Sequence, residues 1–384
     1  MRADAVLRRG LLARLCARDG RRQDVRLPSR RQDVWVIGLN AWNPQAPDLP
    51  PLTELLDDAR AAAGDPVAAL ALAEQAADVL PLPGTGRTAA LWRGLAELAA
   101  VDLTVARTLE PHLDAVAILD QATEAGYAVP QPAGTWGVYA AEGPGTRLEA
   151  RPAGDGTLLL SGRKPWCSLA EHVDSALVTA WVDEQHRTLV AVDLSHPGVA
   201  LVDEPWVARG LSAVRSTGLR LTEVPAVPVG EPGWYLARPG FAWGGLGVAA
   251  CWLGGATGLA RRLRRGALER QPDQIGLSLL GQVDTHLTAA AAVLTEAATA
   301  VDAGLVQGKH AWPRCVRVRH VVHDACEAVL TLAAHALGPG PLAGEEEHAA
   351  RVADLQLYLR QHKAERDAAV VGQAVVDGMP VTWS

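Results

Sequence analysis

Ser161-Gly162-Arg163-Lys164-Pro165-Trp166-Cys167-Ser168, near the middle of the chain, is the segment from which the fold can be worked out. It extends a run of strand-forming residues, Thr157–Ser161. A turn, Gly154-Asp155-Gly156, separates this run from a second one, Arg147–Arg151. An Asp-Gly turn between two such runs is a strong signal for a β-hairpin. We therefore predict a hairpin, with the tryptophan and serine of the quoted segment just beyond its end.

The surrounding block, residues 133–232, has the pattern of β-structure. Short runs rich in Val, Leu and Thr predict further strands at 175–182, 187–193, 199–202 and 218–222. Adjacent short strands are typical of an antiparallel sandwich or barrel. The block has no β-α-β alternation and no G-x-G-x-x-G after a strand, which argues against a Rossmann domain.

Helical blocks flank the β-block on both sides, at 51–132 and 233–384. Long helices with short breaks predict a four-helix-bundle-like C-terminal domain. Its last long helix begins near Glu345, and its apolar face, Val352 to Leu359, reaches His362 at the next position. The predicted fold class is α+β, with an N-terminal helical domain, a middle antiparallel β-domain and a C-terminal helical bundle.

In the first helical block, apolar residues recur at helical spacing from Leu91 to Val116. Pro111 predicts a kink or the start of a second helix. If the register continues across this point, His112 lies on the same apolar face. Glu110 and Asp114 flank His112 but point in other directions, which predicts solvated side chains or pairing between domains.

Composition excludes some classes of function. The net charge is −7, from 36 Lys and Arg against 43 Asp and Glu, which argues against a nucleic-acid partner. The five cysteines show no CxxC spacing, which is typical of reduced thiols in a cytoplasmic protein. His320, His323 and Asp324 have a spacing that metal ligands also show, but a helix surface explains them, and we predict no metal site.

Two segments need separate treatment. Residues 1–50 are rich in Arg and then in Pro, and we expect a disordered basic extension. Pro239 to Ala260 carries no charged residue and is long enough to span a bilayer. Its many glycines leave few large apolar side chains, so we expect a buried helix with close neighbours and no membrane partner.

The α, β, α order and several local motifs resemble the acyl-CoA dehydrogenase superfamily over about residues 65–375. Ser161–Ser168 is similar to the family segment NGxKxWIT. Arg215–Gly218 with Thr222–Pro228 is similar to the segment that ends the β-domain in the family. Leu337–Gly340 stands where the family has a glycine-rich turn. The resemblance identifies the chain as a divergent member of the superfamily.

The resemblance implies a flavin cofactor, FAD or alternatively FMN. It places Trp166 against the flavin ring and Ser168 in contact with the cofactor. The other positions that it assigns to the cofactor are Ala141, where the family has Thr, Arg270, Gln282, Gly338 and Gly340. In the family the segment of Arg270 reaches the flavin of a neighbouring subunit, which implies a homo-oligomer, dimer or tetramer.

The same resemblance implies oxidation of an acyl thioester or a related small molecule, with acyl-CoA as one candidate. The family's base is a Glu, and matching Asp354 and Tyr358 to its motif places His362 at that position. His112 and His362 are the candidate catalytic residues, since histidine titrates near neutral pH. Two alternatives stay open: a flavin-dependent monooxygenase of the same fold, and a catalytically degenerate homologue with a binding or structural role.

Overall fold

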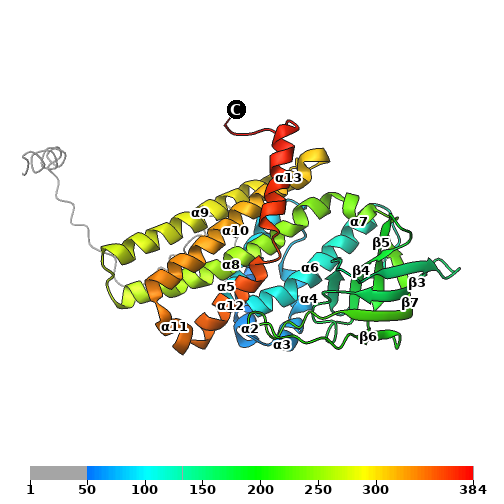
Figure 1. The fold of residues 1–384 in the computed structure, drawn as a ribbon, viewed down its shortest axis with the longest axis horizontal. Helices are drawn as coiled ribbons and strands as arrows, with labels where there is room; N and C mark the ends of the chain where they lie inside the picture. The colour runs from blue at the N-terminus through cyan, green and yellow to red at the C-terminus, as the bar shows by residue number, and fades with distance from the viewer. Residues whose placement is uncertain (1–49, 132, 384) are drawn as a thin grey trace, which may run out of the picture. The chain divides into compact units, whose positions relative to one another are not determined.

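Helices come first in the described chain, then seven strands, then helices again (Figure 1). The structure is a computed structural model that describes residues 50–131 and 133–383, so all but the last residue of the predicted extension lies outside it. The described residues belong to one compact unit. The element order agrees with the α+β class, while the boundaries at 132 and 232 stay predictions as domain boundaries.

Before and within the β-block the helices and strands are short, apart from the two helices α5 and α6 that directly precede the strands. The helices are α2 (Pro50–Ala61), α3 (Pro66–Leu70), α4 (Ala73–Val79), α5 (Thr88–Val101) and α6 (Leu103–Glu124). The strands are β1 (Trp136–Tyr139), β2 (Leu148–Pro152), β3 (Leu158–Lys164), β4 (Ser175–Trp181), β5 (Arg187–Asp193), β6 (Val199–Leu201) and β7 (Leu219–Val229).

The C-terminal part contains the longest helices. They are α7 (Trp234–Ala237), α8 (Pro239–Glu269), α9 (Gln274–Asp302), α10 (Ala311–Leu337), α11 (Pro339–Gly344), α12 (Glu346–Leu359) and α13 (Ala364–Val376), with a 3₁₀ turn η1 (Gly308–His310) before α10.

The sheet confirms the predicted hairpin and contains two parallel pairings that were not predicted. Strands β2 and β3 pair antiparallel across the predicted turn, with Pro152 opposite Leu158. The pairings β4–β2, β2–β3, β3–β7, β7–β5 and β5–β4 close a ring of strands. Strands β1 and β2, however, both pair parallel with β4, so the sheet is not purely antiparallel. The long connection between β1 and β4, which includes the hairpin, lets the chain return in the same direction.

Helix α6 lies against the sheet and begins where the sequence did not predict a break. Asp102 interrupts the helical run with extended backbone, and its carboxylate accepts a hydrogen bond from Val105 N. An aspartate in this position is a favoured N-cap, which is why the chain divides here. Pro111 instead lies inside α6, where its missing N–H leaves the carbonyl of Arg107 without an intrahelical donor.

The contact between α6 and the sheet is a hydrophobic core. From α6 come Ala115, Ile118, Leu119 and Ala122, and from the sheet side Trp136, Leu177, Leu189, Ala191 and Val229. Figure 1 shows α6 between the strands and the long helices. One face of α6 therefore packs on the sheet and leaves its opposite face for the helical bundle.

The bundle includes a helix from the first block, so it is not built from residues 233–384 alone. Helix α5 packs against α8 and α9, and α10 packs against α8 and α9. At Gly254 in α8, an added Cβ would lie 2.1 Å from Ala96 O of α5. The uncharged segment Pro239–Ala260 forms the buried part of α8, as predicted.

Helix α9 is the one described helix long and apolar enough to cross a membrane, by length and composition. Only 28% of its most apolar window is buried.

Helix α12 is joined to the loop before β7. The Asp354 carboxylate accepts a hydrogen bond from Leu211 N, and an added Cβ at Gly210 would lie 2.0 Å from Ala353 O. This joint fixes α12 relative to the sheet.

Candidate functional site

Trp166 projects from the end of strand β3 in an unusual conformation. Its φ is 60°, in the left-handed region, and its side chain is 59% exposed. The backbone on either side is held in place, because Cys167 N donates to Thr217 O at 2.9 Å and Leu169 N donates to Arg215 O at 2.8 Å. A left-handed non-glycine residue costs roughly 1–2 kcal/mol, and such residues concentrate at functional sites.

Ser168 connects this segment to helix α6. Its hydroxyl lies 2.8 Å from Ser216 Oγ and accepts a hydrogen bond from Arg107 Nη2 at 2.9 Å. Its carbonyl accepts from the Tyr139 hydroxyl at 3.0 Å. Arg107 Nη1 and Arg215 Nε are buried and have no hydrogen-bond partner among the described residues. The site thus presents hydroxyls and spare N–H donors next to an exposed tryptophan, a set suited to a ligand rich in acceptor oxygens.

The loop that carries Ala141 is tied to the sheet by a buried lysine. Lys164 is 1% exposed, and its Nζ bonds Glu142 Oε1, Thr179 O and Thr179 Oγ1, each at 2.8 Å. Burial lowers the pKa of Lys164, while Glu142 opposes that change. Ala141 itself is exposed and has no side-chain hydroxyl for a ligand. The lysine therefore holds this loop beside the β3 segment.

Helix α6 carries a polar stripe that begins at Arg107. Glu110, Asp114 and Gln121 follow at helical spacing on one face. Their spacing puts the stripe over about 20 Å of helix. These residues were not among the predicted site residues, although the spacing 107, 110, 114, 121 is visible in the sequence.

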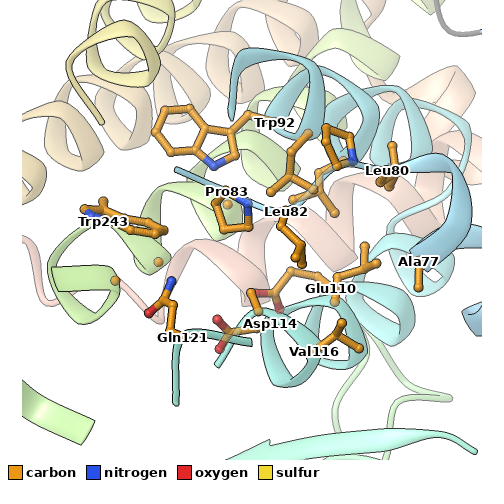
Figure 2. A pocket seen from close by; sticks show the side chains of 18 of the residues that line it. Ala77, Leu80, Leu82, Pro83, Trp92, Glu110, Asp114, Val116, Gln121 and Trp243 are labelled. Carbon is orange, nitrogen blue, oxygen red and sulfur yellow. The ribbon is translucent and has the colours of Figure 1, made fainter. Parts of the chain in front are cut away.

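A cavity of about 50 Å³ opens against this stripe. Glu110, Asp114 and Gln121 lie along one side of it, and Trp92, Pro83 and Trp243 lie around the rest (Figure 2). The remaining walls are mostly apolar and come from α5, α6, α8 and the loop between α4 and α5. That volume holds roughly three to five water molecules or a small chemical group.

The two carboxylates are half-buried and face the cavity, so whether Glu110 and Asp114 are solvated side chains, as predicted, depends on what occupies it. Burial raises the pKa of Glu110 to about 7, with Asp114 adding to the rise and Arg107 opposing it. Burial also raises the pKa of Asp114, and Arg238 opposes that rise. Arg238 donates to Gln121 Oε1 at 2.7 Å. The sequence could not show that neighbouring helices close over this face of α6.

His362 lies in a buried cluster, but not on a helix as predicted. Helix α12 ends at Leu359, and His362 follows in the turn before α13. Its Nε2 lies 2.9 Å from His320 Nδ1, and its Nδ1 lies 3.0 Å from Asp367 Oδ2 without hydrogen-bond geometry. Burial, together with the positive charges of His323 and Arg319, lowers the pKa of His362 to about 4. The ring is therefore neutral at pH 7.

His112 faces the sheet from α6. Its Nδ1 accepts a hydrogen bond from Trp136 N at 3.3 Å, and burial lowers its pKa. The bond ties α6 to the start of β1 and keeps the ring neutral. Its position on α6 is opposite to the polar stripe, and neither His112 nor His362 lines the cavity. Their catalytic role stays a prediction.

The part of the chain that the structure describes contains no group of three or more His, Cys, Asp or Glu side chains placed to hold a metal ion.

No protein-family model matches the sequence, and no curated protein matches it. Solved structures do match. KijD3 in complex with FMN and dTDP-3-amino-2,3,6-trideoxy-4-keto-3-methyl-D-glucose has a TM-score of 0.70 at 18% identity, covering 91% of this chain and 98% of that chain. TdsC from Paenibacillus sp. A11-2 with FMN and indole has a TM-score of 0.66 at 17% identity, covering 88% and 98%.

A nitrososynthase from Micromonospora carbonacea var. africana has a TM-score of 0.68 at 18% identity, covering 90% of this chain and 96% of that chain. The chain has the acyl-CoA dehydrogenase-like fold. The fold implied by the resemblance of Ser161–Ser168 is thus confirmed.

Within this acyl-CoA dehydrogenase-like fold, the predicted cofactor residues form two separate groups. Trp166, Ser168 and Ala141 lie on the sheet side. The others lie at chain positions near the junction of α8 and α9 or of α10 and α11, at the end of the bundle away from the strands (Figure 1): Arg270, Gln282, Gly338 and Gly340. A single chain does not bring these two groups together.

Proposed function

We propose that this protein is a flavin-dependent oxidoreductase acting on a small molecule. The flavin would lie against Trp166 and Ser168, and the reacting end of the substrate would enter the cavity beside Glu110. The observation that carries the proposal is the strained, exposed Trp166 next to donors that have no partner in the described chain, at Arg107 and Arg215. KijD3 and TdsC, which share the fold, have structures with FMN bound.

The residues present fit such a cofactor. A flavin has an aromatic ring that can stack on an exposed tryptophan and acceptor oxygens that can take the spare guanidinium N–H groups. When bound, it would supply the redox chemistry, while the protein supplies binding, orientation and electrostatics. FMN and FAD both fit, because the tryptophan and the guanidinium groups could serve either flavin equally well.

Between the two predicted reactions, oxygenation is favoured over dehydrogenation of an acyl thioester. The position that the family uses for its base holds His362, which is neutral and does not line the cavity. TdsC, with the same fold, is a dibenzothiophene monooxygenase. A small cavity of about 50 Å³ admits only the reacting end of a substrate, and no described feature singles out a CoA handle.

We also propose a homo-oligomer in a reducing, cytoplasmic compartment. The separation of Arg270, Gln282, Gly338 and Gly340 from Trp166 supports a site completed by a second copy. Cys167, Cys251, Cys315 and Cys326 are buried and free, which suits a compartment that keeps thiols reduced. Light scattering of the purified protein gives the oligomeric state directly.

The absorption spectrum of the protein after addition of FMN or FAD and gel filtration tests the cofactor proposal. We expect flavin bands to remain with the protein. Because an aromatic stacking contact contributes about 0.5–1.5 kcal/mol, Trp166→Ala should weaken flavin binding by about two- to tenfold. Trp383→Ala is the matched control, since this tryptophan is 78% exposed and lies near the C-terminus. Loss of flavin by the unaltered protein would favour the catalytically degenerate homologue instead.

A further inference from the structure

Glu110 and Asp114 form a pair of carboxylates within one cavity wall. They are four residues apart on α6, which places them on the same face with Cβ atoms about 5–6 Å apart. Both line the cavity, and their side chains point to the same part of it (Figure 2). Two carboxylates this close, with mostly apolar walls around them, resist being ionised together.

The charges around the pair act from a distance. Among the described residues, neither carboxylate takes part in a hydrogen bond or ion pair, and the interactions that affect them are those of charges farther away. The groups that interact electrostatically with Glu110 or Asp114 are Arg107 from α6, Tyr235 from α7, Arg238 from the start of α8, Cys251 from α8, Arg319 from α10 and Tyr358 from α12. Within residues 50–131 and 133–383, no lysine or arginine contacts either carboxylate directly.

We propose that Glu110 and Asp114 act as one acid–base unit that takes a proton from the reacting group of the substrate. The chain would then carry, on α6, the carboxylate that is missing from the family's usual position. The proposal rests on the proposed function only in taking this cavity as the substrate site. It does not depend on which flavin is bound or on the redox step that follows.

The step is a simple proton transfer. With Glu110 ionised, an N–H, O–H or acidic C–H bond of the substrate breaks, and its electron pair stays on the substrate atom. The proton forms an O–H bond on Glu110, and the remaining carboxylate charge is held by Asp114. Burial puts the pKa of Glu110 near 7, so both protonation states are present at neutral pH, as an efficient acid–base group requires.

Hydrogen–deuterium exchange of nitromethane in D₂O tests this unit without any cofactor. Nitromethane is a carbon acid small enough for a cavity of about 50 Å³. When Glu110 takes a methyl proton, the electron pair remains as the nitronate, and a deuteron from solvent returns to carbon through the same carboxyl group. NMR spectroscopy follows the loss of the methyl proton signal of nitromethane in the presence of the full-length protein and in buffer alone.

We expect the protein-dependent exchange rate to fall by about 100-fold in Glu110→Gln, in line with the usual size of general acid–base catalysis. Glu124→Gln is the matched control, because this exposed glutamate lies on the same helix but outside the cavity; it should leave the rate unchanged. Asp114→Asn should keep exchange but move its pH midpoint downward, because the like charge that raises the pKa of Glu110 is gone.

Three results would overturn the proposal: exchange by the unaltered protein no faster than in buffer, a Glu110→Gln variant as fast as the unaltered protein, or an unchanged midpoint in Asp114→Asn. Circular dichroism of each variant separates loss of the group from loss of the fold. A protein that exchanges nitromethane but binds no flavin would refute the proposed function and leave the acid–base unit standing. The reverse outcome would refute the unit alone.

Discussion

The histidine cluster around His362 and the carboxylate pair on α6 are both buried, and burial favours the neutral form in both. In histidine this lowers the pKa, to about 4 for His362. In a carboxyl group the same effect raises the pKa, to about 7 for Glu110. At neutral pH the first group is a weak base, while the second is balanced between its two forms.

The surroundings of the two groups also differ. The two ring nitrogens of His362 lie next to His320 and Asp367, so other side chains of the protein surround them. Glu110 and Asp114 face a cavity instead. The comparison shows that a residue at the expected sequence position can lie in a part of the structure closed to a substrate, while the reactive group comes from another helix.

The largest expected contrast is in nitromethane exchange. His362→Asn should change the rate by less than about threefold, against the roughly 100-fold loss expected for Glu110→Gln. The physical reason is that His362 does not line the cavity. A double variant should be no slower than Glu110→Gln alone. If His362→Asn abolished exchange in a folded protein, the histidine would regain the role of base.

Stability should depend on pH in opposite ways at the two sites. The pKa of Glu110 is raised from 4.5 to about 7, so its contribution is present below pH 4.5 and is lost as pH rises towards 7. The pKa of His362 is lowered from 6.5 to about 4, so its contribution is present above pH 6.5 and is lost as pH falls towards 4.

Chemical denaturation of variants across pH checks these signs. Relative to the unaltered protein, Glu110→Gln should gain about 3 kcal/mol in unfolding free energy between pH 4.5 and pH 8. His362→Asn should gain a similar amount between pH 7 and pH 4. Parallel pH profiles for the two variants would show that burial does not act on the two groups as described.

The smallest expected effect comes from Arg319, whose charge influences the pKa of a group in each of the two regions. Its guanidinium lies 4.7 Å from the centre of the Trp252 ring and lowers the pKa of both Glu110 and His362. Arg319→Met should therefore move both titration midpoints upward by less than about one pH unit. NMR titration of the His362 ring and the pH profile of nitromethane exchange measure the two shifts. A shift of only one group would separate the two regions electrostatically.

Local signals in the sequence predicted much of the fold. The turn Gly154-Asp155-Gly156 fixed the hairpin, because its conformation depends on those residues alone. The predicted strand at 187–193 is present with the same bounds. The parallel pairing of β1 with β4 was missed, because it joins residues far apart in the chain.

The candidate site was harder to predict. Trp166 and Ser168 were found through a local motif, and the structure places them together at the end of β3. The position of His362 depended on continuing a helical register past Leu359, where α12 in fact ends. Glu110 was predicted to be solvated or paired between domains, because the packing of α5 and α8 over α6, which half-buries it, is not visible in the local sequence.

Infrared spectroscopy of the carboxyl groups across pH shows whether Glu110 titrates near neutrality. A protonated carboxyl band should disappear with a midpoint near pH 7, because burial raises the pKa of Glu110 to about 7. The same band should be absent in Glu110→Gln and present in the Glu124→Gln control. A spectrum with no carboxyl titration near neutral pH, or one that Glu110→Gln leaves unchanged, would show that Glu110 is not an acid–base group with a raised pKa.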